Sequence, residues 1–282
     1  MPIYEQGYRR YEARSALHTF RFWPITREAL AALLRKRAFL GLLLVCFVPF
    51  VVRVVQIYIV ARFPEAGRVL PVDGRLFGEF LNQQIGLAIL LTIFGGSGLV
   101  AGDLRTGAIL VYLSRPLTRR DYVIGKLGVL MALNLAITLV PAQLLYLTGL
   151  TLAPDDFLKW DLAWISPAIV VHSLVISLVL SLLALAISSL SRSGRVAGLA
   201  FFGLLMVLEI VRGVLQAGFD LELGALLSLQ ADLRTLGVAL FGMAARRIEP
   251  IAWPESAMIL SLVAGGCLLI LRSRVRAVEV VK

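Results

Sequence analysis

The sequence contains few of the residues from which catalytic and metal sites are built. Only two histidines and two cysteines occur among 282 residues, and both cysteines, Cys46 and Cys267, lie within long apolar runs without a metal-ligand spacing. A disulfide framework or a metal site is therefore not expected. The chain also lacks the HExxH, GxSxG and P-loop motifs, and no lysine lies within an apolar run. We therefore expect that this chain is not an enzyme and holds no cofactor of its own.

Charged residues are also scarce. They make up 16% of the chain, whereas 59% is hydrophobic and the mean hydropathy is +0.86. This is too apolar for a soluble domain of this size and predicts an all-α membrane protein. The net charge of +10 comes largely from basic residues beside the apolar runs. Basic residues in that position set topology and meet anionic lipid, so we expect membrane lipid, and not nucleic acid, as a partner.

Six apolar runs are long enough to cross a bilayer as helices. The segments outside these runs alternate between a positive net charge and a net charge that is zero or negative. By the positive-inside rule, this pattern predicts that both termini lie in the cytoplasm. The predicted spans cover about residues 38–60, 80–102, 127–150, 165–190, 196–217 and 251–271. The net charge is +5 for residues 1–38, +3 for 103–126, +2 for 191–195 and +3 for 272–282, against 0 for 61–79, −2 for 151–166 and −2 for 218–255.

Two segments beside the spans have patterns of their own. Residues 1–38 mix aromatic with basic side chains and include a helix start at Pro24, which predicts an N-terminal interfacial and connecting helix before a six-span domain of residues 39–282. Residues 218–250 are too apolar for a solvated loop and too often interrupted by charge for a full crossing. They predict a pair of re-entrant helices between spans five and six, on the outer side.

The connection 103–126, here called the docking element, is more organised than a simple loop requires. Asp103 is expected to cap a first helix, and Pro116 is expected to end it. Thr118 and Asp121 have the spacing of a capping box, which predicts the start of a second helix. One side of the first helix is apolar, and the turn is rimmed by arginine: these residues are Leu104, Ala108, Ile109, Tyr112 and Leu113, and Arg115, Arg119 and Arg120. The pattern is typical of a surface that docks a partner.

Few ionisable residues lie within the predicted spans. Arg53 and Glu209 are expected at similar depth, and Arg212 lies one turn beyond Glu209. One reading is that Arg53 and Glu209 pair across helices and close a gate or line a substrate path. The alternative is that Glu209 is neutralised by Arg212 while both arginines reach the headgroups, and both readings stay open. His172 starts a polar stripe, continued by Ser173, Ser177 and Ser181, which favours interhelical hydrogen bonding.

The docking element contains a set of residues between spans two and three of six: Gly107, the run Leu113-Ser114-Arg115-Pro116, Arg119 or Arg120, and Gly125-Lys126. In these residues and their placement, it resembles the corresponding connection in the membrane subunits of type-2 ABC exporters. The resemblance extends to the basic interfacial helix before span one and to the re-entrant pair between spans five and six.

The resemblance implies a machine of four chains in the plasma (inner) membrane of a prokaryotic cell. Two permease chains, identical or paired with a relative, would form the substrate path as a dimer. Two separate cytoplasmic ATPase subunits would bind ATP and Mg²⁺. Residues 103–120 would be the coupling helix that docks on the ATPase. The implied coupling residues are Asp103, Leu104, Gly107, Ala108, Tyr112, Leu113, Arg115, Pro116, Arg119 and Arg120.

Two other classes of function remain as alternatives. A membrane anchor could recruit a cytoplasmic partner through the same docking element without a conduit. A secondary transporter is less favoured, because ion-coupled carriers place carboxylates near the bilayer midplane and only Glu209 comes near it. The sequence does not name the cargo, and drug, lipid, peptide and glycolipid all remain open, as does mechanical work without cargo.

Overall fold

The computed structural model describes residues 22–68, 70, 72–108, 118–152, 163–219, 227–243 and 252–274. Within these ranges the ordered elements are all helices and there is no strand. Six helical stretches are long and apolar enough to cross a membrane, which confirms the predicted all-α architecture with six spans. These stretches are Arg37–Arg62, Gly74–Thr106, Arg119–Leu152, Ile165–Leu190, Gly194–Ala217 and Trp253–Arg274.

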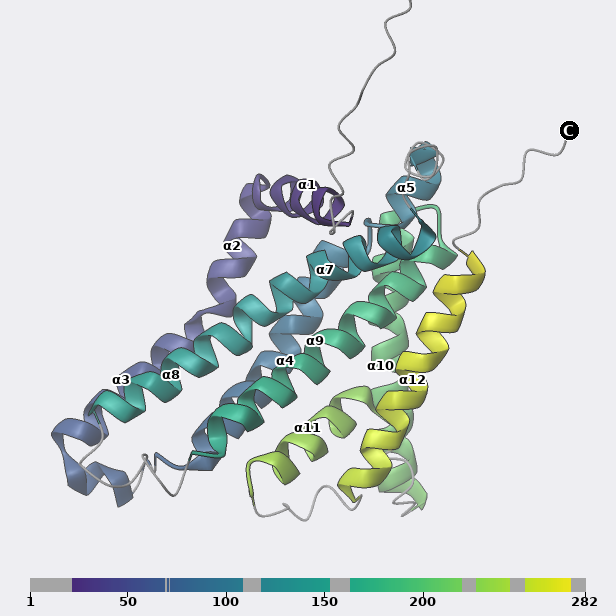
Figure 1. Cartoon of the computed structure of the whole chain (residues 1–282). Helices are drawn as coiled ribbons and strands as arrows, with labels where there is room; N and C mark the ends of the chain where they lie inside the picture. Colours follow the sequence, from purple (N-terminus) through teal and green to yellow (C-terminus); the bar gives the residue numbers. More distant parts are fainter. Residues whose placement is uncertain are drawn as a thin grey trace, which may run out of the picture.

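Several of the spans are built from two consecutive helices (Figure 1). Span one breaks at Phe47, where Pro49 lies in the first turn of the second helix. Span three breaks at Thr138, because Pro141 cannot donate a backbone hydrogen bond to Ile137. The elements are α1 (Trp23–Leu34), α2 (Arg37–Cys46), α3 (Val48–Arg62), a 3₁₀ turn η1 (Pro64–Arg68), α4 (Gly74–Gly96), α5 (Ala101–Thr106), α7 (Arg119–Ile137), α8 (Leu139–Leu152), α9 (Ile165–Leu190), α10 (Gly194–Phe219), α11 (Leu229–Leu240) and α12 (Trp253–Arg274).

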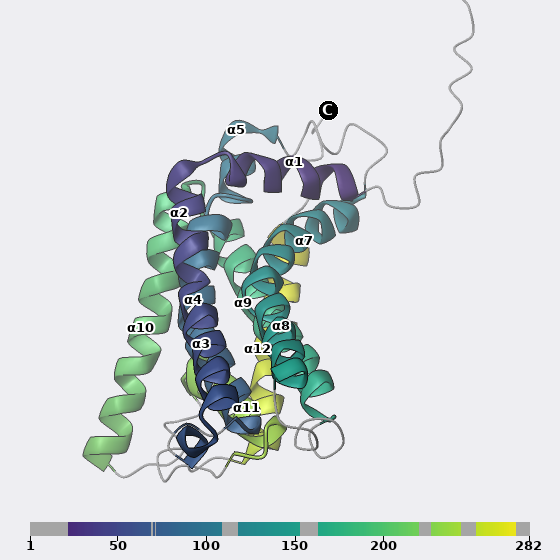
Figure 2. The same cartoon turned by 90° about the vertical axis from the view of Figure 1, so that its left-hand side faces the viewer.

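The helix α9 forms the centre of the bundle and contacts α4, α7, α8, α10, α11 and α12. In its most apolar stretch, 67% of residues are buried, against 11% for the span of α2 and α3 and 17% for α10. Figure 2 shows α10 at one side of the bundle and α7 with α8 at the other. The core is therefore organised around α9, whereas spans one and five present most of their apolar surface outward.

The polar stripe on α9 joins this central helix to its neighbours. His172 hydrogen-bonds through Nε2 to the carbonyl oxygen of Leu233 in α11, at 3.0 Å. Ser181 accepts a hydrogen bond of 3.5 Å from the Asn134 amide in α7, and the same amide lies 3.0 Å from the Thr92 hydroxyl of α4. At His172 and Ser181, the interpretation as interhelical hydrogen bonding is confirmed.

The segment between spans five and six is described only in part. The helix α11 packs against α12, α4 and α9, and it lies at the end of the bundle away from α1 (Figure 1). Residues 220–226 and 244–250 lie outside the described part of the chain. One of the two predicted helices is therefore observed, and the re-entrant path stays a prediction.

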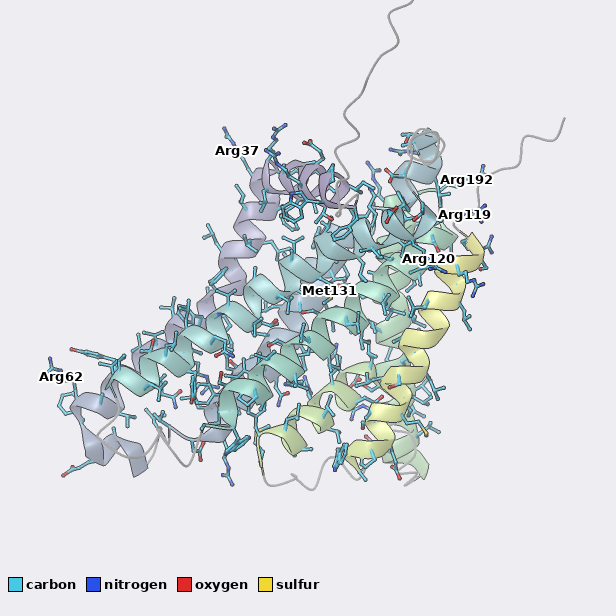
Figure 3. All side chains as sticks on the ribbon, viewed as in Figure 1. Arg37, Arg62, Arg119, Arg120, Met131 and Arg192 are labelled. Atoms are coloured by element: carbon cyan, nitrogen blue, oxygen red, sulfur yellow. The ribbon has the colours of Figure 1, made fainter. Side chains whose placement is uncertain are left out.

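Basic side chains gather at one end of the bundle. Figure 3 shows Arg37, Arg119, Arg120 and Arg192 at the end where α1 and α5 lie, whereas Arg62 lies at the opposite end. We call the first of these the basic end. The charge pattern of the sequence predicts that it faces the cytoplasm. In Figure 2, α1 runs across the basic end, which is the arrangement expected of an interfacial helix.

Candidate functional site

The helix α5, which leads into the docking element, is attached to the core at its start by a side chain from α9. The Ser188 hydroxyl oxygen accepts hydrogen bonds from the backbone N–H groups of Val100 (3.2 Å) and Ala101 (3.0 Å). The same hydroxyl donates to the carbonyl oxygen of Ser97, at 2.8 Å. Val100 has no polar side chain with which to cap α5, so Ser188 supplies the cap from another helix. The start of α5 is thereby held on the central helix of the bundle.

Asp103 has a different role from the one predicted. Because α5 begins at Ala101, Asp103 lies in the first turn and is not the helix cap. Its Oδ2 atom accepts from Lys126 Nζ at 2.7 Å and from the Tyr122 hydroxyl at 2.8 Å. The side chains of Asp103 and Lys126 are only 17% and 6% exposed. A largely buried ion pair therefore joins α5 to α7.

The first helix of the docking element is shorter than predicted. Gly107 has a φ of 70°, a left-handed conformation that ends α5 after Thr106. The prediction of one continuous helix from Asp103 to Leu113 is therefore wrong, because the sequence pattern did not account for a helix-ending conformation at this glycine. Leu104 and Ala108 are both partly exposed on either side of this break. The predicted coupling residues Tyr112, Leu113, Arg115 and Pro116 lie outside the described residues.

The second helix of the docking element starts as predicted. Thr118 is the N-cap of α7, and its hydroxyl oxygen accepts from the backbone N–H of Asp121 at 3.2 Å. The Asp121 carboxylate in turn accepts from the backbone N–H of Thr118 at 2.9 Å. The capping box is confirmed, and it leaves Arg119 and Arg120 exposed at the basic end (Figure 3).

The Gly125-Lys126 pair, which contributed to the family resemblance, has two structural roles. The hydroxyl of Thr26 in α1 donates to the Gly125 carbonyl oxygen at 2.8 Å. A Cβ atom at position 125 would lie 3.0 Å from Ile25 Cβ and 3.1 Å from the Phe22 carbonyl oxygen. Gly125 therefore allows α1 to approach α7, and Lys126 ties α7 to α5. The three elements at the basic end are bonded into one unit.

Arg53 and Glu209 do not pair within the described part of the chain. Arg53 in α3 donates to Glu79 Oε2 of α4 at 3.2 Å and to Gln56 Oε1 at 2.9 Å. Glu209 in α10 is paired with Arg212, which is the local alternative stated above, and it also accepts from the Ser228 hydroxyl. Each charge thus has a partner, and neither residue provides an unpaired charge for a gate.

A second buried carboxyl lies in α11. Asp232 is 1% exposed, and no described residue is placed to hydrogen-bond either of its carboxylate oxygens. Burial raises the pKa of this carboxyl to about 7. The nearby Ser256 hydroxyl of α12 favours the ionised carboxylate and so acts to lower the pKa, but its effect is smaller than that of burial. The group is therefore largely protonated in mildly acidic solution, which lowers the cost of its burial.

Sequence reasoning missed the partners that connect distant segments. Glu79, Ser188 and Ser228 lie far along the chain from the groups they bond, so no local spacing identifies them. Lys126 had a weak signal, because it is a lysine at the start of a long apolar run. A charge in that position is expected either to reach the headgroups or to pair, and the structure shows the pair.

Comparison with protein-family models gives one match over most of the chain. A family described as "ABC-2 family transporter protein" matches residues 23–227. The matched range contains α1, the docking element and spans one to five. A search of curated proteins found no match.

Proposed function

We propose that this chain, which belongs to the ABC-2 family of transporter proteins, is the permease subunit of an ATP-driven exporter. Membership of the family implies association with ABC ATPase partners, and its members are typically non-catalytic membrane subunits. In the proposed complex, ATP and Mg²⁺ bind to the partner ATPase. The permease chains form the substrate path in the plasma (inner) membrane.

The observation that carries the proposal is the bonding of the docking element to the core. A force on α5 reaches α9 through the bonds of Ser188 to Val100 and Ala101. The same force reaches α7 through the Asp103–Lys126 ion pair. An exposed segment that is rigidly tied to two spans is suited to transmit a movement of a cytoplasmic partner into the membrane.

The N-terminal helix takes part in the same movement. Because Thr26 is bonded to the Gly125 carbonyl oxygen, α1 is attached to α7 one residue before Lys126. We infer that α1, α5 and the start of α7 move as one body when the ATPase subunits close. Alternating access then needs only two arrangements of this body, whose populations are shifted by nucleotide binding.

A second permease chain is proposed to pack on spans one and five. These spans are the least buried of the six. Their exposed apolar side chains include Leu44 at 71%, Val52 at 59%, Val207 at 56% and Ile210 at 64%. Apolar surface that faces lipid is ordinary in a membrane protein, but two poorly buried spans that both pack on α4 favour a protein neighbour in addition to lipid. The partner is an identical chain or a relative.

The test is co-purification with the ATPase partner, followed by ATP hydrolysis in lipid. Arg119→Glu combined with Arg120→Glu reverses two exposed charges of the docking element and should abolish assembly or reduce hydrolysis about tenfold or more, as loss of a rim of oriented charges does at interfaces. A second variant, Leu113→Asp with Arg115→Glu, tests the remainder of the predicted surface. Arg272→Glu with Arg274→Glu in α12 is the control of equal charge change.

Three outcomes separate the candidate functions. Normal assembly and hydrolysis in both docking variants would show that the docking element does not couple to the ATPase. Assembly of a complex that never hydrolyses ATP in response to the permease would favour the membrane anchor. Loss of hydrolysis in the docking variants alone would support the exporter.

A further inference from the structure

A cavity of about 930 Å³ opens beside α4 and α10 toward the basic end. Its walls come from the start of α2, the second half of α4, α5 and the first turns of α10. Beside it, the start of α10 lies close to the turn between α4 and α5, because a Cβ atom at Gly194 would lie 3.0 Å from the Cα of Gly98. The absence of side chains at Gly98 and Gly194 thus allows this close approach, and both glycines line the cavity.

Three basic side chains from three different elements line this cavity. They are Lys36 before α2, Arg105 in α5 and Arg195 in the first turn of α10. None of the described residues that line the cavity is acidic. None of the ion pairs among the described residues includes these three cations, so no described carboxylate lies within 4.0 Å of them. The cavity therefore concentrates positive charge that the described part of the chain does not neutralise.

The position of Arg195 is unfavourable for the helix that carries it. A basic residue in the first turn opposes the helix dipole, and the first turn of α10 contains no acidic residue to compensate. An anion bound between the N-terminus of α10 and the three cations would remove this conflict. Helix N-termini and basic side chains together form a common phosphate-binding arrangement.

The remaining wall of the cavity is apolar. Phe94, Leu199 and Phe202 line it, with 65%, 72% and 45% of their surfaces exposed. A free inorganic anion would leave this apolar wall without a partner, and a neutral lipid would leave the three cations without one. An amphiphile that has both an anionic headgroup and an acyl chain matches both halves of the cavity.

We propose that this cavity binds an amphiphile with a phosphate headgroup, taken from the leaflet at the basic end. The headgroup lies among Lys36, Arg105 and Arg195, and the acyl chain lies along Phe94, Leu199 and Phe202. The role of the amphiphile as cargo rests on the exporter function proposed above, whereas its binding does not.

The test uses native mass spectrometry of the purified full-length chain with phosphatidylglycerol or phosphatidylcholine. Wild-type protein should retain phosphatidylglycerol in clear preference. The triple variant Lys36→Gln, Arg105→Gln, Arg195→Gln should lose this preference, with binding weakened about tenfold or more because three surface cations are removed. The triple control Arg192→Gln, Arg272→Gln, Arg274→Gln removes three exposed basic residues that do not line the cavity and should bind as wild type does.

A second pair of variants tests the apolar half. Leu199→Gln should weaken phosphatidylglycerol binding, whereas Leu262→Gln, a similarly exposed position on α12 outside the cavity, should not. Equal losses in the cavity and control variants would mean ordinary surface attraction and would overturn the proposal. Displacement of the lipid by millimolar inorganic phosphate would also overturn it, since a free anion would then suffice.

The two proposals fail in different ways. If the binding results are negative while the ATPase partner still assembles and hydrolyses ATP, only the amphiphile site is wrong. If cavity-dependent binding is found but the docking variants assemble and hydrolyse normally, the coupling role is wrong and the site stands.

Discussion

Lys126 places its Nζ atom 2.7 Å from the Oδ2 atom of Asp103, and this ion pair joins the two described halves of the docking element. The Tyr122 hydroxyl donates to the same oxygen, and the Lys126 ammonium lies 5.7 Å from the centre of the Tyr122 ring. Asp103 is thus engaged inside the permease. Its side chain is only 17% exposed, so it adds little to the outer surface of the docking element.

Breaking the Asp103–Lys126 pair should destabilise the basic end. Asp103→Asn leaves a buried lysine without its carboxylate, and removing one partner of a buried pair costs about 3 kcal/mol. Thermal unfolding in detergent should show the loss. The double variant Asp103→Asn with Lys126→Gln should be less harmful than the sum of the two single changes, because no uncompensated charge remains. Additive effects would contradict the pairing.

Gly125 should not tolerate a side chain. The Cβ of Gly125→Ala would meet Ile25 Cβ and the Phe22 carbonyl oxygen at 3.0 and 3.1 Å, so α1 must shift away from α7. We expect a loss of about 1–3 kcal/mol, as for other overpacked sites. Crosslinking of a cysteine pair placed in α1 and α7 should fall as well. Gly41→Ala is the control, because nothing lies within 4 Å of a Cβ there, and it should leave both measurements unchanged.

Gly107 should be needed for the break between α5 and the rest of the docking element. Its φ of 70° is unfavourable for any residue with a Cβ, so Gly107→Ala should cost about 1 kcal/mol. The rate of ATP hydrolysis by the proposed complex should fall even where the variant remains folded, because the orientation of the docking element changes. Gly102→Ala in the same helix has an ordinary helical φ and no close neighbour. A similar effect from both substitutions would argue against a role for the break.

The stability of the chain should depend on pH through Asp232. Since burial raises the pKa of this carboxyl from 3.8 to about 7, the folded state binds more protons than the unfolded state between these values. Stability should therefore be greatest at the acidic end of this window and should fall as the pH rises toward 7. Asp232→Asn should flatten this dependence in thermal unfolding scans at pH 5.5 and pH 8. An unchanged slope in the variant would assign the effect to another group.

Charge exchange should distinguish the two pairings considered for Glu209. Glu209→Arg alone places two arginines together on α10 and should destabilise the chain. Adding Arg212→Glu restores a local pair and should recover most of the loss. Adding Arg53→Glu instead should not help, because Arg53 is bonded to Glu79. Recovery with Arg53→Glu, measured by thermal unfolding or by transport, would support the pairing of Arg53 with Glu209 across helices.

Much of the fold was predictable because its signals are local. Hydropathy identified the six spans, and the span 165–190 was predicted with the bounds that α9 has. The capping pattern predicted the start of α7 at Thr118. Within the docking element, the sequence predicted where the second helix starts but not where the first one ends. The left-handed conformation of Gly107 is one of several that glycine adopts readily, so the sequence alone did not select it.

The sequence by itself determined that this protein is a helical membrane protein with six spans and an organised, basic connection between the second and third. These properties follow from hydropathy, charge and capping, which act over a few residues. The tertiary structure alone decided the partners from distant parts of the chain: Lys126 for Asp103, Ser188 for the start of α5, Glu79 for Arg53 and Ser228 for Glu209. Several residues of the same chemical type could form each of these bonds. The arrangement of the helices determines which of them lies close enough, and that arrangement depends on contacts between segments far apart in the chain.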